Sequence, residues 1–152
     1  MDKKQISKIE EMLMIIPTKM CRNMDQHFVN VTLKNIPVKI AKHHFMILKM
    51  LQKKDRFYVT EIVHILGITK SQMTASVDKL IKLRFVKRQT DDKDRRKNYI
   101  SLTNEGLEIT KKVTTEIKER FHENIEKLSE QDIIDLEKGL KVLTKFCIQN
   151  EQ

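Results

Sequence analysis

The chain has 152 residues and a formal net charge of +9, which is enough for one domain of ordinary size and too few for two. Hydrophobic residues make up 39% and charged residues 34%, a balance that supports a folded core and excludes a disordered chain. No apolar run approaches the roughly 18 residues of a membrane span, the N-terminal stretch lacks the apolar segment of a signal peptide, and Cys21 and Cys147 are too few for a disulfide scaffold. We therefore expect a cytoplasmic protein with no membrane partner.

The basic residues are concentrated in the middle of the chain. Residues 70–97 hold ten Lys and Arg against four Asp, a net charge of +6, whereas residues 104–152 hold eight cations and eleven acids, a net charge of −3. A general excess of Lys does not explain an acidic C-terminal third. The segregation favours an anionic partner that binds the middle of the chain.

In chain order, the first predicted element is a long helix over residues 5–32, in keeping with a chain that has only 3 Gly and 2 Pro. Apolar residues at spacings of three and four form one stripe, which comprises Ile6, Ile9, Leu13, Ile16, Met20, Met24, Phe28 and Val31. Pro17 removes a hydrogen bond and collides with the preceding turn, so we expect a kink there or a break into two helices. Residues 33–40 form a connector, and residues 41–53 form a short helix with its apolar side inward, at Phe45, Leu48 and Leu51.

Two helices joined by a tight turn follow. We predict a helix over residues 59–66 with Thr60 as its N-cap, ended by Gly67 in a left-handed conformation. Thr69 and Gln72 have the spacing of a capping box and begin the next helix, which runs to about Leu83. Its buried side carries Met73, Val77, Leu80 and Ile81, and its opposite side carries small, polar or cationic residues, namely Ser71, Gln72, Ala75, Ser76 and Lys79.

Two short strands and two helices complete the chain. Two strands are predicted at about 85–89 and 98–102, where side chains alternate between two faces with a period of two. The wholly polar segment TDDKDRRK joins them as a hairpin. Thr103 caps a long helix, and Ser129 with Asp132 begins a final one.

This order of elements is that of a winged helix-turn-helix, a fold that suits double-stranded DNA. A helix fits the major groove, where Gln72 can pair with adenine, Ser71 and Thr74 can bind bases or phosphates, and the small Ala75 allows close approach. Lys70 and Lys79 take phosphates, while Arg95 and Arg96 of the hairpin reach the minor groove. The alternative is a plain amphipathic surface helix beside a solvated loop, with no DNA bound.

The hairpin also carries a family resemblance. Asp94-Arg95-Arg96-Lys97 is followed by NYIS and then by Leu102-Thr103, which resembles the wing pattern of the MarR-type (multiple antibiotic resistance) regulators. The preceding LGITKSQMTASVDKLIKLRFVKR is similar to the recognition-helix segment of that family. The resemblance covers residues 41–106, and the flanking helices in arrangement only. It implies that Arg96 is the minor-groove residue and that Asp94 is the acid that positions it.

Three residues depart from the family pattern. Lys97 stands where a small residue is usual, Ala75 stands where a basic residue is frequent, and Arg84 occupies a helix-end position commonly held by Gly. A left-handed Arg84 costs on the order of 1 kcal/mol. These departures bear on the DNA sequence that is bound more than on binding itself.

The expected fold class is mostly α (α+β), in a single domain over residues 1–152. Residues 33–103 form the winged-helix core with its two-stranded wing, and residues 1–32 and 104–152 form flanking dimerisation helices. A lone helix with such an apolar stripe leaves a large apolar patch in water, so we expect a homodimer on a palindromic operator. The alternative is that these helices pack within one chain.

The family resemblance implies that a small molecule, an oxidant or a metal releases the DNA, which makes a repressor the expected role. An organic effector pocket is predicted at Met20, Met24, Phe28 and Phe45. A redox-sensing role is predicted for Cys21. A weaker hypothesis is a metal site, whose candidate ligands are Cys21 with Asp25, His122 with Glu126, and the neighbouring His43 and His44.

Motifs of catalysis are missing from the sequence. It has no Gly-rich phosphate loop, no HExxH and no G-x-S-x-G, so we expect no enzyme, no bound metal and no cofactor. Two other classes stay open, a redox- or metal-sensing regulator and a protein-interaction module that retained the fold.

Overall fold

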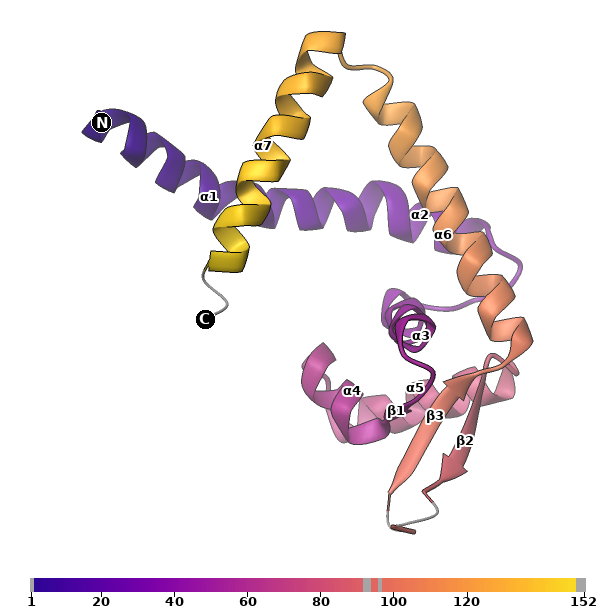
Figure 1. Ribbon diagram of the computed structural model, residues 1–152. Coiled ribbons are helices and arrows are strands. Elements are labelled where there is room, and N and C mark those ends of the chain that lie inside the picture. Colours follow the sequence, from indigo (N-terminus) through magenta and orange to yellow (C-terminus); the bar gives the residue numbers. More distant parts are fainter. Residues whose placement is uncertain (1, 92–93, 96, 150–152) are drawn as a thin grey trace. The chain divides into compact units, whose positions relative to one another are not determined.

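The computed structural model describes residues 2–91, 94, 95 and 97–149 (Figure 1). The chain divides into two compact units, residues 1–117 and residues 118–152, and each is described here by itself. The expectation of a single domain over the whole chain stays a prediction. No helix of the described part is both long enough and apolar enough to cross a membrane.

The N-terminal helical stretch of the first unit has three parts. These are α1 (Lys3–Asn23), the π-helical segment η1 (Met24–Val29) and α2 (Asn30–Asn35). Helix α1 continues through Pro17, so of the two outcomes expected there the break is wrong, and the ribbon of α1 bends part-way along (Figure 1). None of the described residues of α1 is buried. The apolar stripe of this helix therefore lies in water in the single chain.

Three helices and a short strand form the centre of the unit. They are α3 (Lys42–Lys53), β1 (Phe57–Tyr58), α4 (Val59–Leu66) and α5 (Lys70–Lys82). Strand β1 was not expected from the sequence. The N-cap of α4 is Tyr58 rather than Thr60, because the Glu61 carboxylate accepts a 2.8 Å hydrogen bond from the Tyr58 backbone N–H and so begins the helix two residues earlier.

Helices α4 and α5 are joined as the sequence predicts. Gly67 ends α4 with φ +61° in the left-handed region. The Thr69 hydroxyl then accepts from the Gln72 backbone N–H at 3.1 Å, while the Gln72 side-chain oxygen accepts from the Thr69 backbone N–H at 3.0 Å. This capping box fixes the point at which α5 begins.

A left-handed residue also ends α5, where Arg84 has φ +61°. The Phe85 N–H donates to the Leu80 carbonyl at 2.9 Å and the Arg84 N–H donates to the Ile81 carbonyl at 2.8 Å. These two bonds make a Schellman motif, which normally has Gly at the left-handed position. The chain thus departs from the usual glycine and accepts strain at this turn.

The small sheet has the strand order β1-β3-β2, with β2 (Val86–Thr90) and β3 (Asn98–Leu102) antiparallel. The predicted hairpin is confirmed, with Arg88 opposite Ile100 in the register. Strand β1 pairs Tyr58 with Tyr99 and makes the sheet three-stranded. Figure 1 shows β2 and β3 side by side, extending away from α3.

The core of the first unit lies between α3, α4, α5 and the sheet. It includes Ile47, Leu48, Ile62, Met73, Val77, Leu80, Ile100 and Val113. Helix α6 (Asn104–Ile125) begins beside it, where the Thr103 hydroxyl accepts from the Gly106 N–H at 3.0 Å, as predicted. Gly106 allows a close approach, because a Cβ there would lie 1.9 Å from the Phe85 carbonyl oxygen.

The second unit holds the end of α6 and all of α7 (Glu130–Gln149). The Ser129 hydroxyl accepts from the Asp132 N–H at 3.1 Å and caps α7, as the sequence predicts. The larger apolar residues of α7 are at the surface, including Ile134, Leu136, Leu140, Val142, Phe146 and Ile148.

Candidate nucleic-acid interface

The outward face of α5 is polar and cationic. Every residue predicted from the sequence to contact DNA on this helix is exposed, and these are Lys70, Ser71, Gln72, Thr74, Ala75 and Lys79. Ser76, which we expected on the same face, is buried, because it lies three residues after Met73 and four before Leu80 on the inner side of α5. Its hydroxyl donates to the Gln72 carbonyl at 2.7 Å. A hydroxyl bonded to its own helix loses little on burial.

The Gln72 side chain is already engaged in the free protein. Its oxygen accepts from both the backbone N–H and the hydroxyl of Thr69, the latter at 3.1 Å. Pairing with adenine needs the amide oxygen and the amide nitrogen together. A bidentate pair with adenine would therefore require Gln72 to give up its cap bonds.

The hairpin places more cations beside α5. Lys87, Arg88, Arg95 and Lys97 are all exposed. Arg96, which the family resemblance assigns to the minor groove, lies outside the described residues. The role of Asp94 as its positioning partner stays a prediction; the Asp94 carboxylate lies 3.6 Å from the Lys97 ammonium.

An ion pair connects the two cationic elements. Arg88 Nη1 of β2 lies 3.9 Å from Asp78 Oδ1 of α5. Both side chains are at the surface, so the pair adds little to stability. It shows that the cations of the hairpin and of the helix lie on adjoining surfaces.

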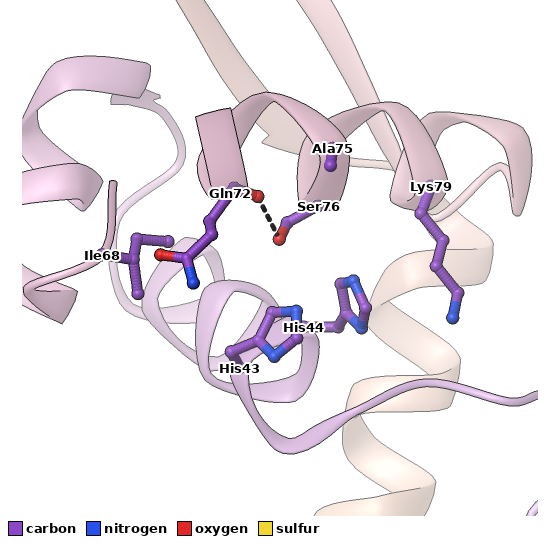
Figure 2. Close-up of a pocket in the computed structure, with 7 residues that line it drawn as sticks. All are labelled: His43, His44, Ile68, Gln72, Ala75, Ser76 and Lys79. Atoms are coloured by element: carbon purple, nitrogen blue, oxygen red, sulfur yellow. Dashed lines mark hydrogen bonds between the residues drawn. The ribbon is translucent and has the colours of Figure 1, made fainter. Parts of the chain in front are cut away.

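Two cavities adjoin α5. One, of about 390 Å³, lies between α3 and α5 and is lined by His43, His44, Ile68, Gln72, Ala75, Ser76 and Lys79 (Figure 2). The other, of about 250 Å³, lies between the start of α4, α5 and the hairpin, and is lined by Tyr58, Val59, Thr60, Thr74, Arg88, Lys97 and Asn98. Sequence reasoning did not predict either cavity.

His44, which lines the first cavity, has a shifted pKa. Its Nδ1 accepts from the Ala41 backbone N–H at 3.0 Å and so caps α3. Burial lowers the pKa of His44 to about 4, and the nearby charges of His43 and Lys79 act in the same direction. The ring is therefore neutral at physiological pH, as an acceptor must be.

The residues of the predicted effector pocket differ in their burial. Phe45 packs in the hydrophobic core and Phe28 is buried in η1, whereas Met20 is 49% exposed on α1. Neither of the two cavities that adjoin α5 is lined by these side chains. An effector site at this place stays a prediction.

The sensing candidates come from four elements, α1, η1, α3 and α6. Cys21 is an exposed free cysteine of α1, and the Asp25 carboxylate is paired with the Lys42 ammonium. His122 Nε2 lies 3.2 Å from Glu126 Oε1 in the second unit. Within the described residues, no three His, Cys, Asp or Glu side chains form a group that could hold a metal ion.

Sequence reasoning missed one polar contact at the hairpin. The Tyr58 hydroxyl donates to the buried Asp91 carboxylate at 2.6 Å across 33 residues of sequence. The aromatic pair Phe57-Tyr58 before a helix was the available signal for a short strand. Nothing in the local pattern pointed to the partner of the hydroxyl.

Known proteins share this fold. The HTH-type transcriptional regulator PecS of Dickeya dadantii (strain 3937) is 28% identical over 115 residues, which cover 74% of this chain and 69% of PecS. The transcriptional regulator Tm0710 from Thermotoga maritima has a TM-score of 0.75 at 21% identity, over 92% of this chain and 96% of its own. A mutant MarR from E. coli, solved in complex with operator DNA, has a TM-score of 0.62 at 19% identity, over 87% of this chain and 96% of its own.

The family model agrees with the geometry. The model of the MarR family matches residues 38–97, from the connector before α3 to the end of the hairpin turn. This range contains α5 and β2, which carry the exposed cationic face. The winged-helix segment formed by residues 38–97 therefore matches the MarR family of transcriptional regulators.

Proposed function

We propose that this chain is a homodimeric, sequence-specific regulator that binds double-stranded DNA. Helix α5 enters the major groove, and the β2–β3 hairpin lies along the neighbouring minor groove. The observation that carries the proposal is the joint surface of α5 and the hairpin, where exposed cations of both elements adjoin and Asp78 and Arg88 lie 3.9 Å apart.

Six exposed residues of α5 have a role in this proposal. Gln72, Ser71 and Thr74 contact base edges or phosphates, and Ala75 lets the helix backbone approach the bases. Lys70 and Lys79 bind phosphates and set the register. In the hairpin, Arg95 and Arg96 bind in the minor groove, with Asp94 as the acid that positions Arg96.

Relatives support the proposal. PecS is named an HTH-type transcriptional regulator, and the E. coli MarR mutant of similar fold was solved with operator DNA. The identity to either protein is too low to transfer an operator sequence. The proposal for this chain therefore rests on its own exposed residues, with the relatives as support.

The dimer is proposed from the apolar surface of the single chain. Ile9, Ile15 and Ile16 of α1 are each between 44% and 51% exposed, and α7 has a similar apolar surface. A second copy that covers these side chains removes the patch from water. Two-fold symmetry then sets two copies of α5 about 34 Å apart, one turn of B-DNA.

Repression and its release are the finer part of the proposal. A regulator that occupies its operator blocks transcription until a cytoplasmic small molecule lowers its affinity for DNA. The effector residues proposed for this are Met20, Met24, Phe28 and Phe45. The alternative is oxidation of Cys21, which would add polarity to the surface that the dimer covers.

The first experiment is selection of bound duplexes from a random library, followed by fluorescence anisotropy at several salt concentrations. We expect one enriched palindrome and an affinity for it at least about 10³-fold above that for unrelated duplexes. Affinity equal to that of any cationic protein, with no enriched sequence, contradicts the proposal and favours a protein-interaction module.

Two variants test the assignment of the phosphate contacts. Lys70→Ala and Lys79→Ala each remove two contacts per dimer, so the slope of log K against log salt falls by about 1.8. Lys141→Ala on α7, where Lys141 pairs with Glu137, is the matched control and leaves the slope unchanged. Equal slopes for all three variants contradict the assignment.

A further inference from the structure

Tyr58 joins two parts of the winged helix that are distant in sequence. Its hydroxyl donates to Asp91 Oδ2 at 2.6 Å, and Asp91 is only 9% exposed. A short hydrogen bond to an ionised oxygen is about twice as strong as one between neutral groups. The contact is therefore a firm attachment between the first turn of α4 and the hairpin.

Asp91 lies where the paired strands of the hairpin end and the turn begins. Its backbone N–H donates to the Lys97 carbonyl at 2.9 Å, one step beyond the pair Thr90–Asn98 that closes the ladder. Its second carboxylate oxygen, Oδ1, accepts from the Asp94 backbone N–H at 3.0 Å. One carboxylate thus organises the turn and anchors it to Tyr58.

The Tyr58 end of this contact is rigid. Tyr58 is the N-cap of α4 and pairs with Tyr99 in the sheet. The hydrogen bond to Asp91 is the largest cause of a raised pKa at Tyr58, and burial adds to it. The phenol therefore stays a proton donor throughout the physiological range of pH.

A two-stranded hairpin needs such an anchor. Isolated hairpins are marginal in water, and the third strand, β1, pairs only with residues 99 and 100 and stops one residue short of the Thr90–Asn98 pair that closes the ladder. Beyond the ladder lie Lys97 and Arg95, and the proposed function places Arg95 in the minor groove. Their position relative to α5 depends on what holds the turn.

From this geometry we propose that Tyr58 is a positioning residue for DNA binding: by bonding to Asp91 it holds the hairpin turn at a fixed distance from α5. The inference rests on the proposed function. The cavity of about 250 Å³ between them, lined by Tyr58, Thr74, Arg88 and Lys97 among others, is the space whose width the bond sets. Lys97 Nζ lies 6.0 Å from the centre of the Tyr58 ring.

The test variant is Tyr58→Phe, which removes one oxygen atom and keeps the ring. Tyr99→Phe, with its ring under the Arg56 guanidinium at 5.0 Å, removes the same atom from the same sheet and is the control. We expect Tyr58→Phe to bind the selected palindrome about tenfold more weakly, the usual size of one lost bond to a charged group. Tyr99→Phe should bind within about twofold of the unmodified protein.

A double-mutant cycle separates positioning from loss of folded protein. Arg95→Ala removes a hairpin contact, and in the Tyr58→Phe background it should cost several-fold less affinity, because the turn is no longer held at the DNA. A Tyr58→Phe protein that is merely less folded would lose the same factor in both backgrounds. Additive losses overturn the proposal.

A measurement without DNA keeps the failure of this proposal distinct from failure of the proposed function. Hydrogen exchange of the Asp94 and Lys97 amides should be about tenfold faster in Tyr58→Phe and unchanged in Tyr99→Phe. Unchanged exchange in Tyr58→Phe overturns the proposal. If exchange rises but the unmodified protein selects no duplex, the anchor exists and the DNA-binding function is what fails.

Discussion

Asp78 of α5 and Arg88 of β2 face each other at 3.9 Å, and Asp78 is an acid within the cationic surface proposed to bind DNA. In the free protein its carboxylate neutralises part of the Arg88 charge. In the proposed complex the same carboxylate would adjoin phosphates and oppose binding. The pair is therefore expected to reduce the affinity for DNA.

Replacing Asp78 with Asn should strengthen DNA binding. We expect about a threefold to tenfold gain in affinity per dimer at low salt, because a negative charge beside the phosphates is removed. Stability should change by less than about 1 kcal/mol, since the side chain of Asp78 is 61% exposed. Anisotropy titration measures the gain, with Asp135→Asn on α7 as the control. A loss of affinity would place Asp78 away from the DNA.

Gln72 combines a structural role with the proposed reading role, and two variants separate them. Gln72→Ala loses the side-chain half of the capping box, so stability should fall by about 0.5–1 kcal/mol and sequence preference should relax. Gln72→Glu keeps an acceptor for the Thr69 N–H but adds a negative charge, so folding is retained while DNA affinity falls. Thermal unfolding and duplex selection measure the two effects. Unaltered preference in both variants contradicts base reading by Gln72.

Replacing Gly106 and replacing Gly139 with Ala should have opposite effects on stability. Gly106→Ala places a Cβ 1.9 Å from the Phe85 carbonyl oxygen and 2.8 Å from its carbon, so α6 must move from the sheet. We expect a loss of about 3 kcal/mol or more. Gly139→Ala in α7 meets nothing within 4 Å and should gain up to about 1 kcal/mol from helix propensity. Chemical denaturation compares them; a mild Gly106→Ala phenotype would refute the close approach.

His44 predicts a pH dependence of stability. Its pKa is lowered from 6.5 to about 4 in the folded chain, so the unfolded chain binds the proton first as pH falls. Stability is therefore full above about pH 6.5 and declines as pH falls toward 4. His44→Gln keeps an acceptor for the Ala41 N–H without a titrating group. In this variant the unfolding midpoint should depend less on pH over this range. His43→Gln is the control; an equally steep profile in His44→Gln contradicts the assignment.

Local chemistry explains what the sequence could predict. The capping pairs Thr69–Gln72 and Ser129–Asp132, the left-handed Gly67 and the period-two hairpin all depend on residues within a few positions of one another. Each has one well-populated conformation that neighbouring residues select. The sequence therefore predicts the bounds of these elements to within one or two residues of those in the structure.

Contacts over longer separations explain what the sequence could not predict. Strand β1 forms because Tyr58 meets Tyr99, and the site of its hydroxyl bond depends on how the hairpin folds back. Ser76 lies on the buried side of α5 despite its polarity, and a hydrogen bond to its own helix satisfies its hydroxyl. The π-helical segment η1 of the first helix lies beyond Pro17, and no local sequence signal predicted it.

The apolar side chains at the surface of α1 and α7 have a thermal consequence. Met14 is 80% exposed and Val142 is 66% exposed in the single chain. If two copies cover these groups, dissociation and unfolding occur together, and the unfolding temperature depends on protein concentration. Each tenfold dilution should then lower the midpoint by about 2–4 °C.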